Sequence, residues 1–162
     1  MNKGKIVAIS VSRKKGEKKQ NVQEALLIRG LGLEGDAHGD GGLRQVSLLM
    51  DESIQRMRLM GLRVNYGDFA ENIVTRGIDL TGLNLNDRLR IGREGVLEVT
   101  QIGKECKTPC RIYYEVGSCI MPSEGVFCRV VEPGRIAVGD SVSLLIEKGH
   151  RKTIVRNNQV DS

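Results

Sequence analysis

Cysteine is the residue type in this chain best suited to chemistry, and Cys110 has the most distinctive setting. Thr108 has the side chain of a helix N-cap, Pro109 suits the first helical position, and Gly117 suits the position just after a helix end. The pattern predicts a short helix over 109–116 with Cys110 in its first turn, where the helix dipole and adjacent basic residues favour the thiolate. Such a thiolate would bind a metal or attack sulfur. The alternative is a small buried side chain at a helix start.

The other three cysteines complete the spacing C-x3-C-x8-C-x8-C, which contains no C-x2-C pair. This spacing argues against a structural zinc site and against an iron–sulfur cluster. Cys128 alternates with Phe127 along an expected strand, and we expect it to be a structural residue of the core. Cys106 and Cys119 are candidate resolving thiols for Cys110.

A glycine-rich loop supplies two further candidates, with six glycines among the 13 residues of 30–42. Such a density indicates backbone with positive φ or a close approach to a ligand. His38 lies in this loop and is a candidate ligand-binding residue, although a hydrogen-bonded loop histidine is the alternative. Arg44 follows the loop and could clamp an anion, or be an ordinary surface arginine. The loop lacks the spacing of a phosphate-binding P-loop.

A third cluster lies in residues 67–73, where Glu71 and Asn72 precede a short apolar run. A carboxylate and an amide side by side in an apolar setting favour a polar site. A solvated turn is the alternative interpretation.

Six blocks of sequence, in this order, resemble a stand-alone domain of the MOSC family, which is named for the C-terminal domain of molybdenum cofactor sulfurases. The blocks are Gly35–His38, Arg44–Ser47, Gly67–Ile73, Thr108–Cys110, Gly125–Phe127 and Val138–Asp140. The resemblance spans roughly residues 4–146. It implies a mainly β fold, a β-barrel with a few short helices, that binds the molybdenum–pterin cofactor or handles sulfur for it.

The resemblance also implies roles for particular residues. Cys110 falls on the expected molybdenum ligand or sulfur carrier, and Glu71 and Asn72 fall on a block expected near the cofactor. With His38 and Arg44, they form the predicted cofactor-binding set. The sulfurases also carry a pyridoxal-phosphate domain, for which this chain has no room, so pyridoxal phosphate is not an expected cofactor.

Three hypotheses for function stay open. In the first, Cys110 binds molybdenum in an enzyme that reduces N-hydroxylated or N-oxide substrates with an electron-donor protein. In the second, Cys110 carries a persulfide supplied by a cysteine desulfurase. In the third, the domain binds the cofactor without catalysis. Whether the chain is an enzyme, and on which substrate, is therefore undecided at this point.

The elements that must position these residues are mostly short strands bounded by glycines, a pattern that favours a β-barrel. Strands are expected at 5–11, 22–28, 45–50, 72–75, 89–91, 96–102, 126–131 and 141–147. Asp51 is expected to be the N-cap of an amphipathic helix that runs to Gly61. Segments 85–91 and 138–144 resemble each other, which suggests two paired barrel strands.

Length and charge bound the rest. The chain of 162 residues fits a single domain over 1–147, followed by a flexible tail over 148–162. The net charge is +5, but residues 1–20 hold seven of the basic residues against one acidic residue. We therefore expect the terminal lysines to lie outside the site. Aromatic residues make up only 3% of the chain, which argues against specific nucleic-acid binding.

No apolar run approaches the length of a membrane span, and the first residues do not form a secretory signal. We expect no membrane partner and a cytoplasmic location.

Overall fold

The structure is a computed structural model that describes residues 3–15, 17–37, 42–103 and 124–146. Within these residues the chain forms eleven β-strands, one α-helix and one short 3-10 turn. The strands are β1 (Lys3–Val11), β2 (Gln20–Val22), β3 (Glu24–Ile28), β4 (Gly32–Leu33), β5 (Val46–Met50), β6 (Ile73–Arg76), β7 (Arg88–Ile91), β8 (Gly95–Ile102), β9 (Val126–Glu132), β10 (Gly134–Ala137) and β11 (Ser141–Leu145). The helix is α1 (Asp51–Leu59), and the turn is η1 (Leu80–Gly82).

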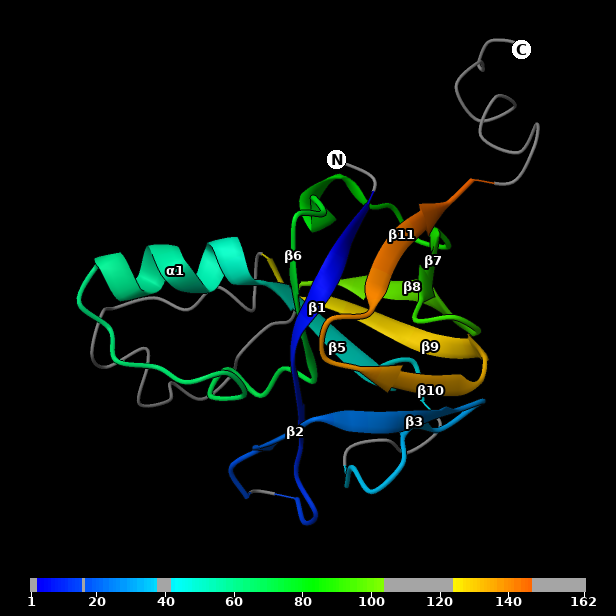
Figure 1. Cartoon of the computed structure of the whole chain (residues 1–162), viewed down its shortest axis with the longest axis horizontal. Helices are drawn as coiled ribbons and strands as arrows, with labels where there is room; N and C mark the ends of the chain where they lie inside the picture. The colour runs from blue at the N-terminus through cyan, green and yellow to red at the C-terminus, as the bar shows by residue number, and fades with distance from the viewer. Residues whose placement is uncertain (1–2, 16, 38–41, 104–123, 147–162) are drawn as a thin grey trace, which may run out of the picture.

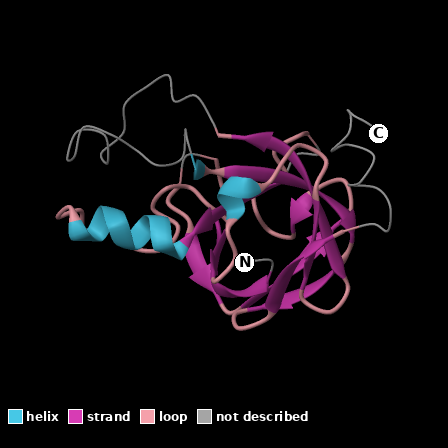
Figure 2. Ribbon diagram, turned by 90° about the horizontal axis from the view of Figure 1, so that it is seen from above, coloured by secondary structure: helices cyan, strands magenta, loops and turns pink. Residues whose placement is uncertain are grey.

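Seven of the strands close into a barrel. Their order is β11-β7-β8-β9-β5-β6-β1, and a further pairing of β1 with β11 joins the two ends. Neighbouring strands are antiparallel except β5 and β6, which pair in parallel. The helix α1 lies between these two strands in the sequence. Figure 2 shows the strands as a ring with α1 to one side of it. The expectation of a mainly β fold with a β-barrel is confirmed.

The barrel interior is filled by aliphatic side chains. Alternate residues of a strand point to opposite faces, so on β5 Leu48 faces the interior while Leu49 faces outward. The interior cluster includes Ile9, Leu48 and Leu89, each 0% exposed. A second cluster on the outer face packs Leu49 against Ile54 of α1. Because these side chains fill the interior, the outer face of the barrel is where the described residues leave room for a ligand.

The paired segments inferred from sequence similarity are adjacent strands in the structure. β7 and β11 are antiparallel neighbours, with Ile91 opposite Val142. The similarity of 85–91 to 138–144 therefore reflects two strands with the same surroundings, each entered through a turn.

Two local expectations are wrong. The single strand expected at 22–28 is two strands, because the chain leaves the barrel after β2 and enters a small sheet of order β10-β3-β4 (Figure 1). Asp51 is the first residue of α1 and not its N-cap, a position held by Met50. The Asp51 carboxylate does not cap the helix. It accepts hydrogen bonds from the side chains of Gln55, Tyr66 and Arg76.

These contacts fix the base of the helix against the barrel. Burial raises the pKa of the Asp51 carboxyl, but the hydrogen bonds from Gln55, Arg76 and Tyr66 outweigh burial and leave that pKa below its usual value. The helix ends near Gly61, whose φ of 99° favours glycine. None of the helices among the described residues is long and apolar enough to cross a membrane. The helix predicted at 109–116 and the tail predicted at 148–162 lie outside the described residues.

Candidate functional site

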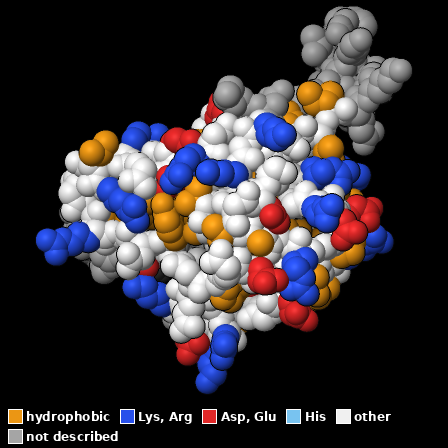
Figure 3. Space-filling view, in the orientation of Figure 1, with side chains coloured by type: hydrophobic (Ala, Val, Ile, Leu, Met, Phe, Trp, Pro, Cys, Tyr) orange, Lys and Arg blue, Asp and Glu red, His pale blue; other side chains and the backbone are white. Residues whose placement is uncertain are grey.

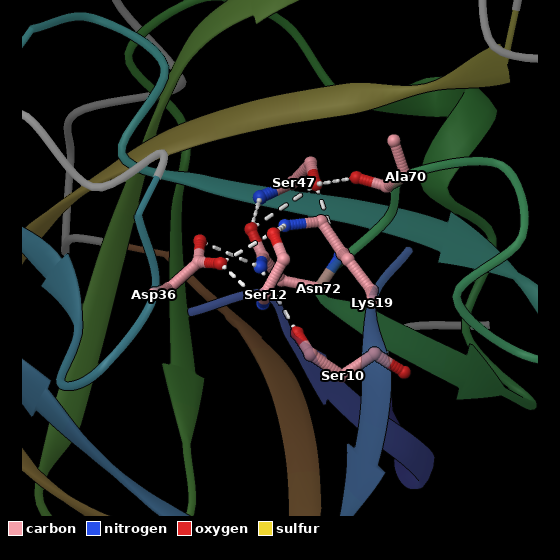
Figure 4. Close-up of polar contacts among 7 residues, drawn as sticks. All are labelled: Ser10, Ser12, Lys19, Asp36, Ser47, Ala70 and Asn72. Atoms are coloured by element: carbon pink, nitrogen blue, oxygen red, sulfur yellow. Dashed lines mark hydrogen bonds and ion pairs between the residues drawn. The ribbon is translucent and has the colours of Figure 1, made fainter. Parts of the chain in front are cut away.

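A buried cluster of polar side chains lies on the outer face of the barrel, where the glycine-rich loop meets β1, β5 and the start of β6 (Figure 4). We call it the polar cluster. Its members are Ser10, Ser12, Lys19, Asp36, Ser47 and Asn72, all less than 9% exposed. It brings together residues from three of the sequence blocks that carry the family resemblance, namely Asp36, Ser47 and Asn72.

Asn72 is the centre of the polar cluster. Its Oδ1 accepts hydrogen bonds from the Ser47 amide at 2.9 Å and the Ser47 hydroxyl at 3.2 Å. Its Nδ2 donates to the Ser10 carbonyl at 3.1 Å and to Asp36 Oδ2 at 3.0 Å. The side chain is thereby engaged on both sides by protein groups. Asn72 holds the glycine-rich loop against two barrel strands.

Lys19 and Asp36 form a buried ion pair within the polar cluster. Lys19 Nζ lies 3.0 Å from Asp36 Oδ1, and the two side chains are 3% and 0% exposed. The same Oδ1 accepts a hydrogen bond from the Ser12 amide at 3.0 Å. Two charges are removed from water only when their pairing and hydrogen bonds compensate for the lost hydration. The expectation that the basic N-terminal residues lie outside the site is therefore wrong for Lys19.

No sequence signal separated Lys19 from its neighbours. It is the last residue of a run of charged residues, of which Lys14, Lys15 and Lys18 are exposed. Only the position directly before β2, where the chain turns back toward the barrel, distinguishes it. Asp36 is likewise part of the Gly35–His38 block, but the sequence analysis does not identify it as a site residue.

Glu71 lies beside the polar cluster and organises the loop that precedes Asn72. It is 0% exposed and accepts hydrogen bonds from the amides of Gly67 at 2.7 Å and Phe69 at 3.0 Å. Gly67 has φ 99° and Ala70 has φ 67°, so this loop takes a conformation that needs such support. Burial raises the pKa of Glu71 to about 7 from its usual 4.5, although the backbone N–H groups lower it in part.

Arg44 lies just before β5, with its guanidinium over Phe127 of β9. Its guanidinium carbon lies 5.9 Å from the centre of the Phe127 ring, and the residue is exposed. The next residue, Gln45, fixes the backbone here, since its amide donates to the Cys128 carbonyl and its side chain accepts from the Val130 amide. Among the described residues Arg44 forms no ion pair, so its guanidinium is available to an anion.

Strand pairing and hydrogen bonds place five residues of neighbouring strands in one row. Ser10 donates its amide to the Asn72 carbonyl at 2.7 Å, Ser47 is opposite Phe127, and the Thr100 hydroxyl lies 3.1 Å from the Phe127 carbonyl. The row runs across β1, the start of β6, β5, β9 and β8 on the outer face. We call these five residues, from Ser10 to Thr100, the outer row.

Cys128 is a structural residue, as expected. It is 0% exposed in the barrel interior, and burial raises the pKa of its thiol well above its usual value. A thiol in this state neither binds metal nor reacts readily. Its neighbour Phe127 points to the opposite face, into the cluster under α1.

The remaining cysteines and His38 lie outside the described residues. The cysteine-bearing segment 104–123 connects two points that are tied together, because the Gly103 amide donates to the Gly125 carbonyl at 2.7 Å. Gly125 is two residues from Phe127 of the outer row. Within the described ranges, no group of three His, Cys, Asp or Glu residues could hold a metal ion.

Comparison with protein families identifies the fold. The family model described as MOSC domain matches residues 35–143. This chain belongs to the MOSC domain family. The MOSC match covers Asp36, Ser47 and Asn72 of the polar cluster together with Arg44 and Glu71, whereas Lys19 precedes it.

Solved structures agree on the MOSC fold. YuaD protein from Bacillus subtilis is 20% identical, with a TM-score of 0.73 over 88% of this chain and 95% of that chain. YiiM from Geobacillus stearothermophilus is 19% identical, with a TM-score of 0.65 over 88% of this chain and 75% of that one. YiiM from Escherichia coli is 20% identical, with a TM-score of 0.61 over 88% and 70%. A comparison with curated proteins gave no match.

Proposed function

We propose that this MOSC domain binds the molybdenum–pterin cofactor on the outer face of the barrel beside Arg44, with the Cys110 thiolate as metal ligand, and reduces N-hydroxylated or N-oxide substrates. The observation that carries the proposal is the MOSC match over 35–143, because MOSC domains are generally associated with this cofactor. The domain is then an oxidoreductase, and we propose that it works in the cytoplasm with a separate electron-donor protein.

The described residues fit such a cofactor in two respects. The filled barrel interior leaves the outer face for a ligand, and on that face Arg44 offers an exposed guanidinium, backed by the Phe127 ring, to a phosphate group. A soft metal favours thiolate. Of the cysteines, Cys128 is excluded by its burial in the barrel interior, so a thiolate ligand must come from segment 104–123.

The chain's own residues then divide the work. Cys110 provides the metal ligand, Arg44 holds the cofactor's phosphate, and His38 hydrogen-bonds to the cofactor from the glycine-rich loop. Asn72 and Glu71 act on the cofactor through the loops that they hold in place. When bound, the cofactor would supply the chemistry for a two-electron reduction of the N–O bond, with the electrons coming from the donor protein, two protons from solvent, and the oxygen leaving as water.

Metal and pterin analysis of protein purified from a molybdate-replete host tests this proposal. Wild-type protein should contain molybdenum and pterin in near-equal amounts. Cys110→Ser should lose any reduction of N-hydroxylated substrates, while the pterin and the molybdenum that it carries stay bound. Cys128→Ala is the matched control, because it removes a cysteine from the core. Reduction of N-hydroxylated substrates by Cys110→Ser at the wild-type rate would refute the ligand assignment.

A second candidate is persulfide transfer to the cofactor or to another metal–sulfur centre. It is favoured by one observation, that Cys106, Cys110 and Cys119 lie within a single stretch of 106–119. Sulfane-sulfur labelling after incubation with a cysteine desulfurase distinguishes it, since only a carrier gains label on Cys110. Bound cofactor without label or turnover would indicate a non-catalytic binding module.

A further inference from the structure

A cavity of about 270 Å³ lies at the β8 end of the outer row. It is lined by Leu43, Leu85, Asn86, Glu98, Val99, Thr100 and Arg129. It shares a wall with the Arg44 position, because the Thr100 hydroxyl contacts the carbonyl of Leu43, the residue just before Arg44, and also that of Phe127. A ligand in this cavity would therefore lie directly beside a cofactor held at Arg44.

Two walls of the cavity are aliphatic side chains that face water. Leu43 is 66% exposed and Leu85 is 57% exposed, although they come from loops far apart in the sequence. Single exposed leucines are common on protein surfaces. Two of them on opposite segments that line the same hollow form an apolar surface which a bound aliphatic group would cover.

The charged side chains that line the cavity are Glu98 and Arg129. Glu98 is buried, with its side chain 11% exposed, and it pairs with Arg129 at 2.7 Å and with Arg88 at 3.0 Å. Two guanidinium groups thus share one carboxylate. Arg129 is half exposed, and its Nε and one Nη contact Glu98. Its other N–H groups have no acceptor within the described ranges. These donors match a carboxylate on the ligand.

We propose that this cavity binds small organic acids that combine a carboxylate with a short aliphatic body. The volume lies just below that of drug-sized ligand pockets and suits a small metabolite. That the substrate is such an acid bearing an N–O group rests on the proposed function. The binding of small organic acids in this cavity is independent of the proposed function.

The test measures binding of hexanoate, hexan-1-ol and acetate to the purified full chain by amide chemical shifts. Hexanoate should bind and shift the amides of Leu43, Leu85 and Thr100. Hexan-1-ol lacks the charge and acetate lacks the aliphatic body, so both should bind about tenfold more weakly or worse. Equal affinity for hexanoate and hexan-1-ol, shifts confined to other parts of the barrel, or no binding of hexanoate would overturn the proposal.

Variants locate the contacts. Arg129→Gln should weaken hexanoate binding by about tenfold or more, which is the loss of one charge-assisted hydrogen bond. Leu43→Ser changes only an exposed side chain and should also weaken it, which keeps the test valid if Arg129→Gln is unstable. Arg90→Gln is the control, because Arg90 is an exposed arginine of β7 outside the cavity. Unchanged binding in both Arg129→Gln and Leu43→Ser would refute the site. Binding is measured without turnover, so failure of the molybdenum analysis and failure here are distinguishable.

Discussion

Lys19→Met should destabilise the domain far more than the loss of any exposed lysine. The substitution leaves the Asp36 carboxylate, whose side chain is 0% exposed, without its cationic partner. Removing one member of a buried ion pair typically costs about 3–5 kcal/mol. Asp36 keeps its hydrogen bonds from the Ser12 amide and from Asn72, so we expect the low end of that range, about 3 kcal/mol.

Urea unfolding, followed by circular dichroism, measures this loss. Arg29→Met is the matched control, because Arg29 forms an ion pair with Glu132 in which the side chains are 65% and 53% exposed. Exposed pairs contribute about 0–1 kcal/mol, so the control should stay within that range. Lys19→Arg keeps the charge and should recover part of the loss.

A loss below about 1 kcal/mol in Lys19→Met would refute the reasoning, since it would mean that the pair is no more important than a surface pair. The second readout is the glycine-rich loop. Asp36 is two residues from His38, so a loop released from Lys19 should expose its amides to hydrogen exchange in Lys19→Met and not in Arg29→Met.

Five further outcomes are expected from the sequence and the structure together. The folded-state pKa of Glu71 lies above its unfolded value, so ionisation opposes folding, and the unfolding free energy should fall by about 3 kcal/mol as pH rises from 4.5 through 7; urea titrations at several pH values should show a weaker slope in Glu71→Gln, and an unchanged slope would contradict this. In alkylation followed by mass mapping, Cys110 should react first and Cys128 last, and early labelling of Cys128 in the folded protein would contradict its burial. Asn72→Ala should lower the unfolding free energy by about 2 kcal/mol or more in urea, because it removes hydrogen-bond partners of Asp36 and Ser47. Arg44→Ala should change the unfolding free energy by no more than about 0.5 kcal/mol. The same Arg44→Ala substitution should weaken cofactor binding by about one to two decades. A chain lacking 149–162 should keep its melting temperature and any cofactor binding, and loss of binding would assign the tail to the site.

Short apolar runs and alternation of apolar residues were sufficient to predict most of the barrel strands. The run at 45–50 became β5, and the repeated pattern of a turn followed by an alternating strand located the β7 and β11 pair. These signals are local, because a strand that is buried on one face must alternate whatever its partners are. The strand at Gly134–Ala137 was missed because only two of its residues, Gly134 and Ile136, are buried, and its pairing with β3 lies outside the barrel.

The polar cluster could not be predicted in the same way, because its contacts join distant parts of the chain. Asn72 Nδ2 contacts the carbonyl of Ser10, 62 residues earlier, and Lys19 reaches Asp36 from a different loop. Nothing in the type of these residues fixes the partner. The family resemblance identified the blocks that contain Asp36 and Asn72, but their direct contact follows only from the barrel register that brings β1, β5 and β6 together.

The outer row links structure and proposed chemistry through the barrel's packing. The interior is closed by aliphatic side chains, so the barrel acts as a rigid base and the outward-facing alternate residues decide what binds. At the β1 end the outward residues bond to one another and fix the glycine-rich loop. At the β8 end Arg129 keeps spare donors beside two exposed leucines. Between them, Arg44 rests on Phe127, close to where segment 104–123 rejoins the barrel. An anion-bearing cofactor and an acidic substrate can therefore lie side by side on one face, each held by a different arginine.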